Sequence, residues 1–377
     1  MDKNNPIVTP NARQISGRCL LNGIEVPFIS FDVDNNAMNA ADTFSLTLAS
    51  SALPEEMSLA KWWAEQTKIT VTLFVSITTA KGKDEKQLIV GHADKMRLNL
   101  ARGQITLEGR DFTGLMIDYK SAGESYKNYT ASQIATMIAK SHGLNPVVTP
   151  FNKWRFGEFM NSDVAHLTGE QTDWDLLCNI AGFINYRVYV DGYDLHFEPM
   201  PPDPTEKTAD QYVIRYVPKG TLAYPQANVS DDLEFERNLS ITKGLVVEVM
   251  SWQVRKKSQK QFTASFPTKG STSTKPGTAR AKSQVYRIIR QGLTPQAAAS
   301  LAQSMYQQIS KHEMKMSCST GGDNILNSMM MIRVEGTDSP FDQLYYCDSI
   351  RRSLSWDGGY TMAIQAKNRS PLLEVVG

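Results

Sequence analysis

Apolar side chains recur at every second position between residues 69 and 77. These positions are Ile69, Val71, Leu73, Val75 and Ile77. Successive side chains of a β-strand point to opposite faces, so a period of two places all of them on one face. The segment therefore predicts a strand with one buried face and limits the fold to classes that contain an amphipathic sheet.

Further short strands are expected around this one. Residues 18–21 and 24–28 flank Asn22-Gly23, which favours a type I′ hairpin because both turn residues need a positive φ. Other strands are expected at residues 43–48, 89–91, 95–100 and 104–108. Strands this short and this regularly spaced predict a β-barrel or a sandwich.

The pattern changes near residue 113. Thr130-Ala-Ser-Gln133 is a capping box, in which the hydroxyl accepts a backbone amide and the Gln133 side chain reaches back. A second helix is expected from about Thr172, followed by two strands around an Asp-Gly turn at residues 191–192. This block predicts a small α/β domain, which ends in a stiff proline-rich stretch.

Strand patterns resume in the last part of the chain. They are expected at residues 212–217, 239–254, 329–334, 344–347 and 359–366. Residues 256–277 are rich in Lys, Ser, Thr and Gly and predict an exposed loop. Thr294-Pro295 predicts the start of a helix, with Thr as the N-cap and Pro at the first helical position.

These patterns predict an α+β chain that is mainly β. A first β block is expected, then a small α/β domain, and then a second β block that a loop and a helix interrupt. The expected units are an N-terminal extension (1–13), the first β block (14–115), the small α/β domain (116–205), the second β block (206–255 and 318–377) and the inserted loop and helix (256–317).

The composition of the chain disfavours several classes of function. The chain has 377 residues, and 40 Lys and Arg against 39 Asp and Glu leave a net charge of +1. Proteins that bind DNA through its phosphates usually carry a basic excess, so specific nucleic-acid binding is not expected. The four cysteines are widely spaced and are expected to be buried free thiols. No signal peptide and no membrane-spanning segment is predicted.

Catalytic motifs are absent from the sequence. It has no Walker A motif, no GxGxxG, no GxSxG and no HExxH. Glu170, Asp173 and Asp175 cluster where a helix is expected to begin, and the helix dipole and open amides favour carboxylates there. We therefore predict no enzyme activity, no cofactor and no metal site.

Two segments are candidates for contact with a partner. Trp154, Phe156 and Phe159 lie in a polar stretch without clear periodicity, and they fit partner anchors and a small local core equally well. Lys256 and Lys257 begin a basic stretch that is either a solvated loop or a contact with an acidic partner surface.

Three ordered segments resemble the late control protein D family of contractile phage tails. That family includes the central hub of the phage baseplate and is related to the N-terminal half of type VI secretion spike proteins. The segments are Gly91 to Leu115, Glu170 to Pro199 and the helix that begins at Thr294. The candidate family-motif positions are Gly109, Arg110, Asp111, Asp173, Trp174 and Leu177.

The resemblance, which covers residues 14–368, implies a structural role. It implies that the two β blocks are two tail-tube-like antiparallel β-barrels, with the small α/β domain between them and the helix inserted in the second barrel. It also implies a homotrimer, whose ring of barrels joins a sixfold tail tube to a threefold spike. The implied partners are the tail tube protein, the central spike protein and the baseplate wedge components, with the tape measure protein as a further candidate. DNA would pass through the lumen without specific binding. The implied location is the virion, after synthesis in the host cytoplasm.

Other functions stay open at this point. A tailocin subunit or a type VI-like spike-base protein belongs to the same class. A tail-associated cell-wall hydrolase and a glycan-binding module belong to different classes. Peptidoglycan clearing would indicate the hydrolase, and glycan binding by the isolated protein would indicate the receptor module.

Overall fold

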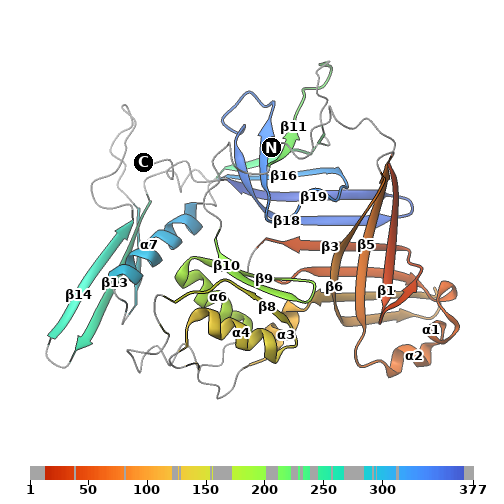
Figure 1. Cartoon of the computed structure of the whole chain (residues 1–377). Coiled ribbons are helices and arrows are strands. Elements are labelled where there is room, and N and C mark those ends of the chain that lie inside the picture. Colours follow the sequence, from red (N-terminus) through yellow and green to blue (C-terminus); the bar gives the residue numbers. More distant parts are fainter. Residues whose placement is uncertain are drawn as a thin grey trace.

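The structure is a computed structural model of the chain, and strands dominate it. The residues that it describes are 13–37, 40–79, 82–120, 126, 129–152, 155, 172–200, 211–221, 228–229, 232–237, 245–255, 258–266, 284–290, 293, 295–310 and 314–368. Figure 1 shows a large sheet, a small α/β unit beside it and a separate sheet covered by one helix. The expectation of a mainly β chain with extensive antiparallel pairing is confirmed.

The strands of the large sheet come from both ends of the chain. They are β1 (Gln14–Leu21), β2 (Ile24–Val26), β3 (Ser30–Asn36), β4 (Thr43–Ala49), β5 (Thr70–Thr79), β6 (Gly82–Asn99), β7 (Gln104–Asp111), β11 (Gln211–Arg215), β12 (Glu234–Arg237), β16 (Met314–Gly321), β17 (Met331–Glu335), β18 (Leu344–Ser355) and β19 (Gly359–Asn368). Their order is β12-β16-β19-β18-β3-β4-β7-β6-β5-β1-β2, with β17 also paired to β18 and β11 paired to β17.

The contact between β3 and β18 joins the first and last β blocks. Residues 30–36 pair antiparallel with residues 349–355, while the other edge of β18 pairs with β19 along most of its length. The two blocks are therefore one continuous sheet in the described chain. Each block still has its own core, because β18 places Ile350 in the core of the last block and Leu354 in that of the first.

The hairpin predicted in the first block is confirmed, whereas the two strands expected at residues 89–91 and 95–100 belong to one strand, β6. Asn22 and Gly23 have φ values of 49° and 83° and connect Leu21 to its partner Ile24. A 3-10 helix η2 (Ser50–Ala52) and the helices α1 (Glu55–Ser58) and α2 (Ala60–Glu65) then cover the end of this sheet. Trp63 is buried there and donates its indole hydrogen to the Met57 carbonyl at 2.6 Å.

The small α/β unit contains three helices and three strands. They are α3 (Thr113–Asp118), α4 (Ala131–Ser141), α6 (Asp173–Ile184), β8 (Asn145–Val148), β9 (Tyr186–Asp191) and β10 (Asp194–Pro199), with strand order β8-β10-β9. The capping box at Thr130 is confirmed, with bonds in both directions between Thr130 and Gln133. Both helices expected from the sequence are present.

Two details of this unit differ from expectation. The hairpin turn consists of Gly192 and Tyr193 rather than Asp191-Gly192, because Asp191 pairs with Asp194 and Gly192 takes the positive φ of 61°. The strand β8, which contains Pro146, was not expected from the sequence. The strand lies at the sheet edge, where a proline that cannot donate a hydrogen bond is tolerated.

A separate three-stranded sheet lies beside α7 (Pro295–Ser310), the helix expected after Thr294. Its strands are β13 (Leu245–Arg255), β14 (Ser258–Phe266) and β15 (Gln284–Ile289), in the order β14-β13-β15. The prediction of a loop from residue 256 is wrong for residues 258–266, which form β14. Polar side chains dominate this strand, but Ala264 and Phe266 pack against the helix, and this sparse pattern suffices for an edge strand.

Candidate functional site, a polar face of the large sheet

One face of the large sheet is polar from β12 to the second half of β6. The strand registers place the following side chains on it, here called the polar face: Glu234, Glu236, Lys315, Ser317, Ser319, Thr361, Ala363, Gln365, Lys367, Ser349, Arg351, Ser353, Ser355, Ser30, Asp32, Asp34, Thr43, Ser45, Thr47, Thr106, Glu108, Arg110, Lys95 and Arg97. The alternate side chains of these strands point to the cores.

Small hydroxyl side chains and paired charges cover this face. Arg97 Nη1 and Lys95 Nζ lie 2.9 and 3.7 Å from the Glu108 carboxylate, and Arg351 Nε lies 3.6 Å from Asp32 Oδ1. Lys315 Nζ lies 3.3 Å from Glu236 Oε2. Exposed pairs of this kind add little to stability. They reduce the positive electrostatic potential at this face, because each cation is partly neutralised by a neighbouring carboxylate.

Large apolar side chains are exposed elsewhere. Among the described residues, the most exposed ones are Trp356 at 84% and Leu100 at 73%, and both lie in turns at the end of the sheet. A shallow hollow is lined by Arg97, Leu98, Leu100 and Gln104 near that end. The polar face itself therefore offers a hydrated surface rather than a hydrophobic docking site.

Two predicted motif positions, Gly109 and Arg110, lie where β7 crosses a bulge in β6. A Cβ atom on Gly109 would lie 2.1 Å from the His92 carbonyl oxygen, and one on Gly91 would lie 1.9 Å from that of Arg110. The two strands therefore approach too closely for any side chain at either glycine. The bulge between Ala93 and Lys95 accompanies this approach.

Arg110 connects the sheet to the small α/β unit. Its Nε and Nη2 donate to the two oxygens of Asp94 at 2.6 and 3.0 Å, and Nη2 also donates to Asp118 Oδ2 at 2.8 Å. Asp94 lies in the bulge of β6 and Asp118 ends α3. The guanidinium fork therefore fixes the angle at which α3 leaves the sheet, and these carboxylates raise the pKa of Arg110 further above its usual value.

Asp111, the next motif position, is buried at the start of α3. Its carboxylate accepts from the Thr113 amide at 3.1 Å and from the Thr113 hydroxyl at 3.0 Å. Burial, and then the nearby Asp42 carboxylate, raise the pKa of Asp111 to about 8. Burial also raises the pKa of Asp42 to about 6, although Asn35 and Asn36 donate to it at 2.7 Å.

Arg352 lies at the boundary between the two cores. It is 2% exposed, donates from Nη1 to Asn35 Oδ1 at 2.7 Å and from Nη2 to the Leu326 carbonyl. Lys86 Nζ donates to the same carbonyl at 3.3 Å, and burial, with Arg352 as the second cause, lowers the pKa of Lys86 to about 8. Lys86 of β6 thus joins the first block to the 322–327 loop of the last block, while Arg352 of β18 links that loop to Asn35 of β3.

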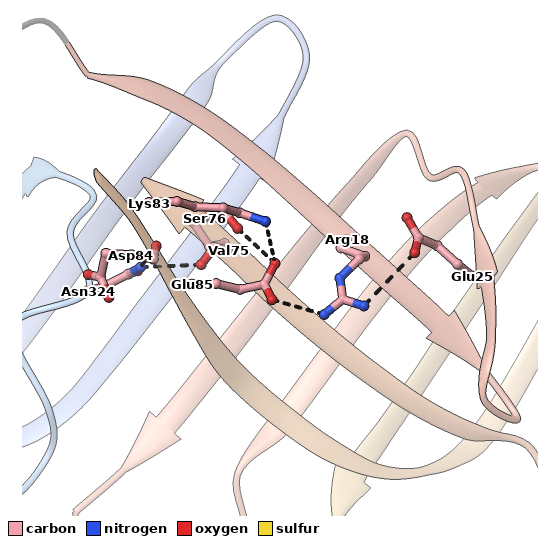
Figure 2. A network of polar contacts seen from close by, with 8 residues as sticks. All are labelled: Arg18, Glu25, Val75, Ser76, Lys83, Asp84, Glu85 and Asn324. Atoms are coloured by element: carbon pink, nitrogen blue, oxygen red, sulfur yellow. Dashed lines mark hydrogen bonds and ion pairs between the residues drawn. The ribbon is translucent and has the colours of Figure 1, made fainter. Parts of the chain in front are cut away.

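Asn324 of the same loop extends this junction across the hairpin of β5 and β6. Its amide donates to the carbonyls of Val75 and Asp84, each at 3.2 Å (Figure 2). Figure 2 also shows the ion pairs that continue over the outer face of the hairpin, from Glu85 to Arg18 at 3.0 Å and on to Glu25 at 3.9 Å. The two β blocks are therefore held by side chains as well as by the ladder of β3 and β18.

The remaining motif positions lie in α6 and pack the small α/β unit. Trp174 and Leu177 are buried in its core. Asp173 Oδ2 lies 2.7 Å from His142 Nε2, which connects the start of α6 to the end of α4. The N-cap of α6 is Thr172, whose hydroxyl accepts from the Asp175 amide at 3.1 Å. These residues therefore fix the fold of this unit and lie away from the polar face.

Five predicted contact residues cannot be placed. Trp154, Phe156, Phe159, Lys256 and Lys257 lie outside the described residues. Conversely, Arg352, Asp42 and Asn324 were not predicted from the sequence. None of the three belongs to a sequence motif. A buried arginine in a strand cannot be distinguished by sequence from a surface arginine until the partner strand is known.

Metal-binding clusters and free thiols were compared with the expectations for the part of the chain that the structure describes. No group of three or more His, Cys, Asp or Glu residues in it is arranged to hold a metal ion. Cys19, Cys318 and Cys347 are buried free thiols, as expected, and Cys178 is half-buried. None of the described helices is long and apolar enough to cross a membrane.

This architecture is that of phage tail proteins and of spike-associated type VI secretion proteins. No family model and no curated protein matches the sequence. A tail protein from Neisseria meningitidis MC58 aligns with a TM-score of 0.66 at 12% identity, over 94% of this chain and 96% of that one. The 43 kDa tail protein of prophage MuSo2 from Shewanella oneidensis aligns with a TM-score of 0.64 at 15% identity, over 94% and 98%.

A third similar structure comes from a secretion system. An Escherichia coli protein, described as a type VI secretion component with structural similarity to the T4 tail proteins gp27 and gp5, aligns with a TM-score of 0.52 at 12% identity, over 94% of this chain and 77% of that one. At these identities the similarity is one of fold. The expected resemblance to hub and spike-type proteins is thereby confirmed.

Proposed function

We propose that this chain is a non-enzymatic hub subunit of a contractile phage tail. In this proposal each β block acts as one tail-tube-like barrel, and three chains form a ring with six such units. The ring joins a sixfold tail tube to a threefold spike, and it contacts the tube protein, the central spike protein and baseplate wedge components. The tape measure protein is a further partner in this proposal, and the assembled location is the virion.

The polar face is the observation that carries this proposal. It extends across both β blocks without interruption, because β3 pairs with β18, so one chain supplies two adjacent segments of a single wall. The Ser and Thr hydroxyls and the locally paired charges keep this face hydrated. They provide no continuous row of unpaired cations to which DNA phosphates could bind. Such a surface suits a channel through which DNA passes without being retained.

The junction between the blocks supports the same role. Lys86 and Asn324 join the 322–327 loop to β6 and β5 of the first block. Arg352 of β18 bonds both to this loop and to Asn35 of β3, and each of these contacts is at least partly buried. A symmetry adaptor must keep its two units at a fixed angle, since each contacts a different position of the ring. We therefore propose that this junction sets that angle.

Solution mass is the first test. Light scattering after size exclusion is expected to give a mass near three times 42.1 kDa. A monomer that remains monomeric after the spike protein is added contradicts the trimeric adaptor. A monomer that becomes a trimer on the spike supports it, with assembly controlled by the spike.

A spike-base protein of a type VI-like system is the second candidate. The similarity to the Escherichia coli secretion component favours it. Pull-down with purified partners separates the two candidates. A phage hub is expected to bind the tail tube protein encoded beside it, whereas a secretion protein is expected to bind secretion tube subunits.

A further inference from the structure

Two cationic side chains meet at one backbone carbonyl where the two β blocks join. Arg352 Nη2 donates to the Leu326 carbonyl oxygen at 2.5 Å, and Lys86 Nζ donates to the same oxygen at 3.3 Å. Lys86 Nζ also donates to the Asn324 carbonyl at 3.3 Å. Both acceptors are neutral, so their dipoles offset only part of the repulsion between the two positive charges.

Neither cation forms an ion pair with a carboxylate of the described residues. No such carboxylate oxygen lies within 4.0 Å of Lys86 Nζ or of the Arg352 guanidinium. Arg352 is 2% exposed, so water does not take the place of a counterion. A buried cation without an opposite charge is costly, and two that share one acceptor are costlier.

The carboxylates that act on the lysine from a longer distance are committed elsewhere or screened. They are those of Asp323, Asp191 and Asp84. Asp323 accepts from the Tyr212 hydroxyl at 2.6 Å and from the Leu326 amide at 3.1 Å. Asp191 and Asp84 are exposed, so solvent weakens their field at the junction. The positive charge of the junction is therefore not balanced by these side chains.

Arg352 also keeps one donor unused in the described part of the chain. Nη1 donates to Asn35 Oδ1 at 2.7 Å, whereas Nε is buried and has no hydrogen-bond partner. The polar groups around the guanidinium have partners of their own. The Tyr360 hydroxyl donates to the Asp323 carbonyl at 3.3 Å, and Asp42 accepts from Asn35 Nδ2 at 2.7 Å. A buried donor of this kind usually faces a bound water or ion.

Charge distinguishes these two occupants. A water molecule accepts from Nε but leaves both cations uncompensated, whereas an anion accepts a hydrogen bond and carries the opposite charge. The Nε atom has less than 1 Å² of accessible surface, which favours a single-atom ion over a larger oxyanion. The chemistry therefore fits a halide.

We propose that Lys86 and Arg352 bind a monovalent anion of the size of chloride, with Lys86 Nζ and Arg352 Nε as its donors. β6, β18 and the 322–327 loop supply the site, so the ion binds where the first and last β blocks meet. By offsetting the two charges, the anion stabilises this junction.

Urea unfolding of the full chain at constant ionic strength tests the binding. Sodium gluconate replaces sodium chloride, because gluconate is too large for the site. Chloride is expected to raise the urea midpoint, with a folded-to-unfolded ratio that increases about 100-fold when its concentration is 100 times the dissociation constant. Equal midpoints in the two salts overturn the proposal.

A pair of variants on one strand assigns the site. Lys86→Gln removes one charge of the pair and is expected to lose most of the chloride dependence. Lys83→Gln is the matched control, because the Lys83 side chain on the same strand is 58% exposed, and it is expected to keep the dependence in full. Equal chloride dependence in the two variants places the anion elsewhere and overturns the proposal.

Bromide locates the ion without any substitution. Crystals of the unaltered chain grown in sodium bromide are expected to give an anomalous peak within hydrogen-bonding distance of Arg352 Nε and Lys86 Nζ. A water molecule at this position, without anomalous signal, overturns the proposal. A bromide peak there without chloride dependence in solution shows binding at crystal concentration only, and it also overturns the proposal.

Discussion

Arg352 Nη1 donates a hydrogen bond to Asn35 Oδ1 at 2.7 Å, although the two residues lie 317 positions apart in the sequence. The bond crosses the boundary between the cores of the first and last β blocks. Replacing Arg352 by Met is expected to lower the free energy of unfolding by about 2 kcal/mol, because Asn35 then keeps a buried oxygen without a donor. Chemical denaturation measures the change.

Arg351 provides the matched control for this substitution. Its side chain is 55% exposed and its partners Asp32 and Asp34 are solvated, so Arg351→Met is expected to change stability by about 0.5 kcal/mol or less. Equal effects at the two positions would contradict a structural role for the buried arginine.

Gly109 is expected to tolerate no side chain. Gly109→Ala places a methyl group 2.1 Å from the His92 carbonyl oxygen, so the pairing of β6 and β7 must distort, at a cost of about 3 kcal/mol. Gly182→Ala is the control, because a Cβ atom there, in the last turn of α6, meets nothing within 4 Å. That change is expected to stabilise the chain by about 0.5–1 kcal/mol, as alanine favours helix over glycine. Thermal unfolding distinguishes the two results.

Asp111 is expected to make stability depend on pH. Its pKa rises from the ordinary value of 3.8 to about 8 in the folded chain, so the folded state binds the proton more tightly than the unfolded state. The contribution of this group is therefore fully present below about pH 4 and is lost as pH rises through 8, with a slope of at most about 1.4 kcal/mol per pH unit.

Asp111→Asn keeps an acceptor for Thr113 and removes this titration. Urea unfolding between pH 6 and pH 8 is expected to show a smaller slope for the variant than for the unaltered chain. Asp42 acts in the same direction only up to about pH 6. Lys86 acts in the opposite direction above pH 8, because its pKa is lowered to about 8. Identical slopes from pH 6 to 8 would show that Asp111 is ionised in the folded chain.

Added positive charge on the polar face is expected to slow DNA passage. In particles assembled with Thr361→Lys and Ala363→Lys, genome ejection should slow several-fold at low salt and recover at high salt, because phosphates then meet unpaired cations. Ser51→Lys with Ala52→Lys adds the same charge at exposed positions outside this face. If both double variants eject DNA alike, the face does not line the channel.

Much of the local structure could be predicted from the sequence. The alternation at 69–77, the Asn22-Gly23 turn and the Thr130 capping box each depend on neighbouring residues, and the structure contains all three. The strand β14 was missed because Ala264 and Phe266 are a weak apolar signal among polar residues. Local patterns report local geometry, so they work best where the partner is close in the sequence.

The site depends on contacts that local patterns do not contain. Arg352 is buried only because β18 pairs with β3, and the Asp42 carboxylate receives its hydrogen bonds from Asn35 and Asn36 at the end of β3. The motif at Gly109 to Asp111 was found by resemblance, while its physical cause is the close approach of β6 and β7. The features that could not be predicted from the sequence are therefore those that depend on pairing between strands far apart in the chain.

The pairing of β3 with β18 also constrains how the chain folds. During synthesis β3 emerges more than 300 residues before its partner β18. Until β18 is available, one edge of β3 therefore has no strand partner. Contacts between such distant residues slow folding, and an uncovered edge exposes the nascent chain to aggregation. The sheet is therefore completed only after β18 has been synthesised, and a cell that makes this protein faster than it folds should accumulate chains in which this pairing has not yet formed.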